Sequence, residues 1–154
     1  MKNALKIIRI IFSLVLGGML VFGGIKKFEN PTPDPTAIIE SVKKGDDVAP
    51  SIEILKIKNY VFGMKQTGYF WAFLGVVEIL SGVLLISQFF SLIGAIIALP
   101  VTINIFLFHL FLEPNEVLEL FQMLALLLIN LTLIGLSYKL WKPLLINRNV
   151  LKLN

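Results

Sequence analysis

Long apolar runs separated by short polar breaks dominate this sequence of 154 residues. The first run extends from Ile10 to Ile25, and with its flanks it predicts a helix over about residues 5–27. A helix needs about 20 apolar residues to cross the hydrocarbon core of a membrane, so this run predicts a first transmembrane span. A cleaved secretory signal peptide is the alternative, but the run lacks an Ala-x-Ala-like cleavage site.

The run over residues 68–112 is too long for one span. As a single helix its 45 residues would measure ~68 Å, against a hydrocarbon core of ~30 Å. The run must therefore fold back on itself, and the polar pair Ser87-Gln88 near its middle marks the turn. This pattern predicts two spans, over about residues 69–86 and 89–112, joined by a tight turn.

A polar break over residues 113–116 separates the third span from the fourth. The break contains a proline, which suits the first turn of a new helix. The fourth span is expected over about residues 115–141, ending before Pro143. Tyr138 and Trp141 stand beside lysines near its end, as in the aromatic belt at a membrane interface. Four spans would place both chain ends on one side of the membrane.

The segment over residues 29–67 is polar and rich in proline at its start. It predicts a short helix over residues 35–44, capped by Asp34 and stopped by Gly45. A second short helix is expected over residues 52–64. The segment is expected to form a small extramembrane cap on the membrane surface.

The predicted fold class is therefore all-α: one membrane domain over residues 1–154, an integral membrane four-helix bundle with a short polar cap between the first two spans. The composition agrees, since 56% of the residues are hydrophobic and only 16% are charged, where soluble domains carry about 25% charged residues. The lipid bilayer is the expected surrounding, in the bacterial cytoplasmic (inner) membrane.

The charges near the two chain ends bear on orientation. All of them are basic, whereas the 29–67 segment and its edges mix acids with bases. Basic flanks favour the cytoplasm, so both termini are expected there. The basic end residues are Lys2, Lys6, Arg9, Lys139, Lys142, Arg148 and Lys152. Because these residues flank apolar runs, the net charge of +4 indicates contact with lipid headgroups, and no nucleic-acid partner is expected.

The chain contains no cysteine. This excludes thiolate nucleophiles, disulfide exchange, iron–sulfur clusters and covalently attached haem, so any redox role needs a bound cofactor or a partner chain. The sequence also lacks a phosphate loop, a nucleophile elbow, a zinc-protease helix and a dinucleotide fingerprint. No catalytic residue is nominated, and the chain is not expected to be an enzyme by itself.

Glu78 is the ionisable residue predicted deepest in the second span. Gly68, Gly75 and Gly82 recur every seven residues, and Glu78 falls on the same helical face. Glycine lets a neighbouring helix approach closely, so Glu78 is expected to point into the bundle. A carboxyl group there costs about 2.5 kcal/mol or more. It is either a ligand or proton site, or a protonated or paired carboxyl that bonds a neighbouring helix.

The third and fourth spans carry further polar residues. His109 and Glu113 are one helical turn apart, but two ligands are too few for a metal, so no metal site is expected. A hydrogen bond between them near the interface is the simpler interpretation. Asn130 is the deepest member of a polar stripe on the fourth span, where helix bonding and ligand binding both remain open. This stripe also contains Glu119, Gln122 and Ser137.

The spans resemble those of the DoxX family of small four-helix membrane proteins. The resemblance lies in Arg9 ahead of the first span, the segment 23–28 at its end, Glu78-x-x-x-Gly82 in the second span and Asn104-x-x-x-x-His109 in the third. It implies a membrane four-helix bundle, and it brings forward Glu78, Asn104 and His109 as site residues. With the residues argued above, the candidate ligand-binding set is Glu78, Asn104, His109, Glu113 and Asn130.

Some DoxX relatives are subunits of thiosulfate:quinone oxidoreductase or associate with oxidative-stress enzymes. The resemblance therefore suggests an accessory subunit of a membrane redox system, with a quinone as the candidate cofactor and a redox protein as the candidate partner. Two alternatives stay open: binding or transport of a small lipophilic molecule without chemistry, and a structural scaffold. A homo-oligomer is also open.

Overall fold

The computed structural model describes residues 2–29, 40, 43–45 and 52–145. These residues form helices and turns and, in the ranges described, no strand, which confirms the all-α class. The helices are α1 (Lys2–Glu29), α3 (Ile52–Gln66), α4 (Phe70–Ile86), α5 (Ser91–Leu112), α6 (Val117–Leu136) and α7 (Tyr138–Leu145).

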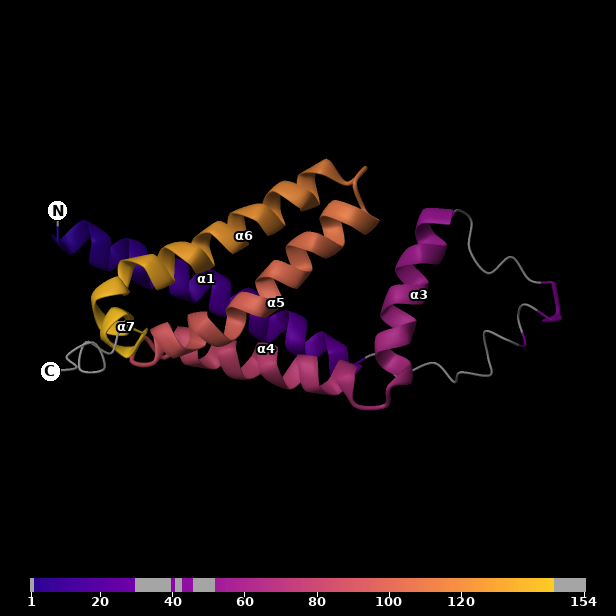
Figure 1. The fold of residues 1–154 in the computed structure, drawn as a ribbon, viewed down its shortest axis with the longest axis horizontal. Helices are drawn as coiled ribbons and strands as arrows, with labels where there is room; N and C mark the ends of the chain where they lie inside the picture. Colours follow the sequence, from indigo (N-terminus) through magenta and orange to yellow (C-terminus); the bar gives the residue numbers. More distant parts are fainter. Residues whose placement is uncertain (1, 30–39, 41–42, 46–51, 146–154) are drawn as a thin grey trace, which may run out of the picture.

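The long helices pack side by side as an antiparallel bundle (Figure 1). α1 packs chiefly against α4, and α5 packs against both α4 and α6. The start of α1, the α4–α5 turn and α7 lie at one end of the bundle. The opposite end holds the α5–α6 turn and α3, which runs across the end of the bundle and buries no residue.

Among the described residues, three helices are long and apolar enough to cross a membrane: α1, α5 and α6. α4 adds a fourth crossing when it is taken together with α3, from which it is bent by 90°. α4 and α5 begin and end within two residues of the expected ranges 69–86 and 89–112. The chain is therefore a multi-pass helical membrane protein.

The surface and the interior of the bundle are also those expected of a protein surrounded by a lipid bilayer. Large apolar side chains are exposed along the length of the long helices, as on Phe22, Phe73 and Leu128, which are 62%, 58% and 54% exposed. In water such a surface would mark a contact with another molecule, and here the bilayer supplies it. The interior is a small cluster: Leu16, Leu20, Leu85, Ala95, Ala98, Val101 and Leu133.

The expected turn at Ser87-Gln88 is present between α4 and α5. The Ser87 hydroxyl donates to the Leu84 carbonyl at 2.7 Å, and the Gln88 side-chain amide donates to the Leu85 carbonyl at 3.2 Å. Gln88 has a φ of +61°, a left-handed conformation that reverses the chain within a few residues. The two polar side chains thus satisfy carbonyl groups that the end of α4 leaves free.

The predicted end of the fourth span is wrong. α6 stops at Leu136, and α7 begins at Tyr138 and continues through Pro143 instead of ending before it. Ser137 closes α6 by donating its N–H to the Ile134 carbonyl at 3.1 Å, and the Trp141 indole donates to the same carbonyl at 2.9 Å. Both bonds go to one carbonyl in the last turn of α6, which the break would otherwise leave without a helical partner.

The polar segment between α1 and α4 is described in part. The helix expected over residues 52–64 is confirmed as α3. The helix expected over residues 35–44 falls largely outside the described residues, and so does its cap Asp34. Gly45 has a φ of +74°, the conformation expected of a residue that stops a helix.

Two glycine pairs bring α1 and α4 together. Gly17 faces Gly82 and Gly24 faces Gly75, so the two helices run antiparallel in a matched seven-residue register. A Cβ on Gly82 would lie 2.6 Å from the Gly17 carbonyl oxygen, and one on Gly24 would lie 2.8 Å from the Gly75 carbonyl oxygen. Gly68, expected on the same face, instead lies in the turn before α4 with a φ of +76°.

Adding a methyl group at Gly17 tests this close contact. In Gly17→Ala the new Cβ would lie 2.8 Å from the Gly82 carbonyl oxygen, so α1 and α4 must separate. We expect a loss of about 1–3 kcal/mol in the free energy of unfolding in detergent. The neighbouring Gly18→Ala is the matched control, since nothing lies within 4 Å of its Cβ. Equal stability of the two variants would contradict the packing.

Candidate functional site

An ion pair joins α1 to α4 inside the bundle. Glu78 lies in the middle of α4 with only 2% of its side chain exposed, as expected from its place on the glycine face. The Lys27 ammonium donates to both of its carboxylate oxygens, at 2.9 and 2.7 Å. A paired carboxylate avoids most of the cost of burying an isolated charge. Of the two interpretations of Glu78, the structure thus contains the paired carboxyl.

Trp71 holds the lysine of this pair in place. The Trp71 indole N–H donates to the Lys27 carbonyl oxygen at 3.1 Å. The Lys27 ammonium also lies 5.2 Å from the centroid of the Trp71 ring, and the Lys65 ammonium lies 5.1 Å from it. An aromatic face within about 6 Å of a cation attracts it. One side chain from α4 therefore fixes both the backbone and the side chain at the end of α1.

A cavity of about 200 Å³ opens beside the ion pair. Glu78, Asn104 and His109, the three residues that the family resemblance brings forward, all line it. Lys27 lines it as well, so that a cation, a carboxylate, an amide and an imidazole meet in one small space. The rest of the wall is mostly aromatic or apolar: Tyr60, Val61, Met64, Trp71, Leu74, Val101, Ile105 and Phe108.

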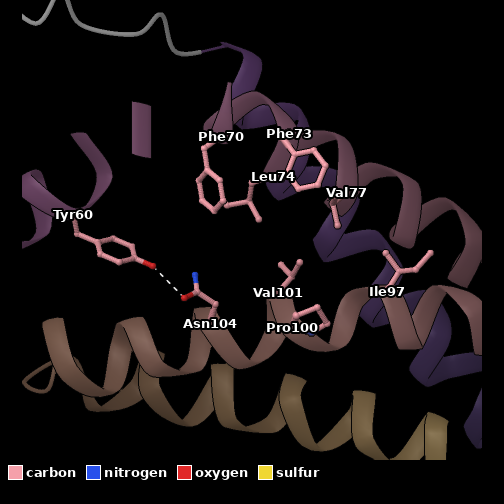
Figure 2. Close-up of a pocket in the computed structure, with 9 residues that line it drawn as sticks. All are labelled: Tyr60, Phe70, Phe73, Leu74, Val77, Ile97, Pro100, Val101 and Asn104. Carbon is pink, nitrogen blue, oxygen red and sulfur yellow. Dashed lines mark hydrogen bonds between the residues drawn. The ribbon is translucent and has the colours of Figure 1, made fainter. Parts of the chain in front are cut away.

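A larger apolar cavity, of about 470 Å³, adjoins it between α4 and α5. Figure 2 shows Tyr60 of α3 reaching Asn104 of α5 at one end, where the Tyr60 hydroxyl donates to the Asn104 amide oxygen at 3.1 Å. The other lining residues carry no polar side chain: Phe70, Phe73, Leu74, Val77, Ile97, Pro100 and Val101. Tyr60 and Asn104 belong to both cavities, so they stand where the apolar space meets the polar one.

His109 and Glu113 contact each other, with 2.7 Å between the imidazole Nδ1 and a carboxylate oxygen. Glu119 of α6 approaches the same nitrogen, at 3.7 Å. The sequence paired the first two residues but did not place Glu119 beside them. His109 also lines a third cavity, of about 260 Å³, between α1, α5 and α6. The imidazole thus stands between two cavities and a pair of carboxylates.

Asn130 is separate from this group. Its side chain is fully buried, and its amide nitrogen lies 3.0 Å from the Thr102 hydroxyl. With the amide turned over, the nitrogen donates to the Ala95 carbonyl at 2.9 Å and the oxygen accepts from the Leu99 N–H at 3.2 Å. Either way Asn130 bonds α6 to α5, and it lines none of the three cavities described above. This geometry favours helix bonding over ligand binding.

Lys27, Tyr60 and Trp71 were not among the site residues expected from the sequence. The glycines held a usable signal, since Gly17 and Gly24 are seven residues apart, as are Gly75 and Gly82. Matching these pairs in antiparallel register places the end of α1 beside the middle of α4, where Glu78 needs a cation.

The fold and the site define a class: a multi-pass helical membrane protein with an ion pair held inside its bundle. The model of the DoxX family matches residues 5–110, which is more than half of the chain. The chain belongs to the DoxX family. The match includes Lys27, Glu78, Asn104 and His109 and ends before Glu113. Neither the curated proteins nor the solved structures contain a match to the chain.

Removing one partner of the ion pair should lower the free energy of unfolding more than removing a surface lysine does. In Lys27→Met the Glu78 carboxylate loses its cation while it stays buried, so we expect the free energy of unfolding to fall by about 3 kcal/mol or more. Lys26→Met is the matched control, because Lys26 is exposed and adjacent. The double variant Lys27→Met/Glu78→Gln should recover part of the loss. Equal losses in Lys27→Met and Lys26→Met would contradict the role of the pair.

Proposed function

We propose that the chain binds a small lipophilic molecule with a polar, carbonyl-bearing head, of the quinone class, and acts as an accessory membrane subunit of a redox system. The observation that carries this proposal is the junction of two cavities at Tyr60 and Asn104. One side of the junction offers charged and polar groups, and the other side is apolar. Ligand pockets combine an apolar wall with a few placed polar groups in this way.

The polar cavity suits the head of such a molecule. Carbonyl oxygens accept hydrogen bonds, and the lysine, asparagine and histidine side chains around this space can donate them. The Tyr60 and Phe108 rings lie 5.5 Å apart on its wall, and Trp71 adds a third aromatic surface. Aromatic side chains pack against flat conjugated rings. The head would therefore meet both donors and stacking surfaces.

The apolar cavity suits the tail. It runs between α4 and α5, and Phe73 on its wall is 58% exposed on the side of the bundle that lipid covers. An apolar chain can enter such a groove from the bilayer without crossing water. A head at Asn104 and a tail along Val77 and Ile97 would use the two cavities together. This arrangement supports a ligand that arrives from the membrane.

Binding or carriage without redox chemistry is the second candidate function. The observation that favours it is the position of His109 and Ile105, which line the polar cavity on one side and the 260 Å³ cavity between α1 and α6 on the other. A lipophilic molecule could use openings on both faces of the bundle. The two functions differ in one requirement. Only a redox subunit needs a partner protein that oxidises or reduces the bound molecule.

Ligand extraction tests the proposal. Protein purified in mild detergent should carry a quinone at near-stoichiometric level, read by its absorbance and by mass spectrometry. Asn104→Ala should lower the affinity about tenfold, the equivalent of one hydrogen bond of ~1.4 kcal/mol. Thr132→Val is the control, because Thr132 is exposed on α6 and its hydroxyl donates to the Leu128 carbonyl of the same helix. A protein that holds only bulk lipid, or equal retention in both variants, would contradict the proposal.

We also propose that both termini face the cytoplasm of a bacterial inner membrane. Seven basic residues and no acid flank the chain ends, whereas nine of the ten acidic residues belong to the 29–67 segment and the α5–α6 region. Short basic flanks are retained on the cytoplasmic side. Because the chain lacks cysteine, Asn115→Cys introduces a single label site at the α5–α6 turn. It should react with an impermeant maleimide in intact cells, and Asn3→Cys only after permeabilisation. The reverse labelling pattern would contradict the proposal and place both termini outside the cytoplasm.

A further inference from the structure

We propose that His109, Glu113 and Glu119 bind one divalent first-row transition-metal ion at the α5–α6 turn. One imidazole nitrogen and two carboxylate oxygens, one from each residue, all lie within 4.8 Å of one another. The proposal rests on this geometry alone and does not depend on a quinone. It revises the expectation from the sequence, in which only His109 and Glu113 were paired and no metal site was expected.

The fold gathers the three side chains from two helices. His109 and Glu113 lie one turn apart at the end of α5, so their side chains share a face. A short turn then reverses the chain, closed by the Glu116 N–H donating to the Glu113 carbonyl at 3.1 Å. Glu119, in the first turn of α6, is thereby returned to the same imidazole. The turn, rather than the spacing in the sequence, brings the third candidate ligand, Glu119, beside the other two.

The distances suit a metal ion. Nδ1 lies 2.7 Å from a Glu113 oxygen and 3.7 Å from a Glu119 oxygen. Two ligands that are each ~2.1 Å from one ion stand ~3.0 Å apart in octahedral geometry and ~3.4 Å apart in tetrahedral geometry. The two observed separations lie on either side of these values. Small rotations of the carboxylates would therefore place an ion between the three ligands.

The imidazole nitrogen Nδ1 of His109 has no hydrogen-bond partner among the described residues. This nitrogen is buried, and a Glu113 oxygen lies 2.7 Å from it without forming a recorded hydrogen bond. Buried polar atoms are nearly always satisfied, so an exception needs an explanation. An ion bonded to the nitrogen and to both carboxylates would satisfy all three groups at once.

The ligand types select the class of ion. Imidazole together with carboxylates suits Zn²⁺, Mn²⁺ and Fe²⁺, whereas soft ions such as Cu⁺ prefer sulfur ligands. Two carboxylates also balance the charge of a divalent ion. Three protein ligands leave at least one position for water, as in metal sites that exchange ligands.

An ion at Nδ1 would also act on the polar cavity, a consequence that rests on the proposed function. A neutral imidazole that gives Nδ1 to a metal keeps its proton on Nε2. His109 lines two of the cavities, and Nε2 is the ring nitrogen that such an ion would leave free. The ion would then fix His109 as a hydrogen-bond donor toward a bound ligand.

Calorimetric titration with Zn²⁺ tests the metal site on full-length, chelator-treated protein in detergent. We expect one bound equivalent in the wild type and an affinity at least about tenfold lower in Glu119→Gln, as for changes that disturb a metal's ligand set. Glu116→Gln is the matched control, since Glu116 is an exposed carboxylate of the same turn outside the cluster. Because Glu119 is 53% exposed, its replacement should leave the fold intact.

Co²⁺ provides a second measurement, because its visible absorption reports direct coordination. The wild type and Glu116→Gln should show this absorption, and His109→Gln and Glu119→Gln should lose it. The proposal would be overturned if the wild type failed to bind one equivalent of added Zn²⁺. Equal Zn²⁺ affinities in Glu119→Gln and Glu116→Gln would overturn it as well. Neither readout involves a lipophilic ligand, so failure here is distinct from failure of the quinone proposal.

Discussion

A carboxylate in the middle of an apolar helix must share its charge with a cation or a proton, and Glu78 does so with Lys27. This requirement constrains the bundle around it. Gly24 and Gly75 let the backbones of α1 and α4 come very close, and the Lys27 ammonium meets the carboxylate beside this contact. The glycine register therefore places the cation where the buried carboxylate needs it.

The same pair gives the bundle a polar interior on one side. Trp71 positions Lys27, and α3 crosses the end of the bundle so that Tyr60 reaches Asn104. The result is a small polar space bounded by α1, α3, α4 and α5, which shares Tyr60 and Asn104 with an apolar groove. Asn130 is the contrasting case, a buried amide that bonds α5 and lines none of the three cavities described above. Polar groups thus serve two purposes in this bundle, and burial alone does not tell them apart.

Much of this arrangement follows from the sequence. Apolar periodicity and run length predicted the long helices and the turn at Ser87-Gln88, because membrane thickness limits how long a span can be. Glycine spacing predicted the inward face of α4 and hence the position of Glu78. The resemblance to DoxX proteins brought forward three residues that line one cavity.

The remainder depends on contacts between elements that are far apart in the chain. Lys27 follows Gly24 by three residues and so shares its helical face, but only the antiparallel contact of α1 with α4 brings that face to Glu78. Tyr60 lies 44 positions from Asn104, on a helix whose apolar pattern is weak. Glu119 joins His109 only through the reversal at the α5–α6 turn. The break at Ser137 was missed because the hydrogen bond that allows it comes from Trp141.

The central claim is that a lipophilic ligand occupies the space between α3, α4 and α5. Photocrosslinking with a diazirine-bearing quinone analogue in lipid nanodiscs, followed by peptide mapping, tests it most directly. The account predicts labelling at cavity residues of α3, α4 and α5, such as Tyr60, Leu74 and Phe108, and competition by unmodified quinone. Labelling spread evenly over lipid-facing residues of α1 and α6, without competition, would contradict it.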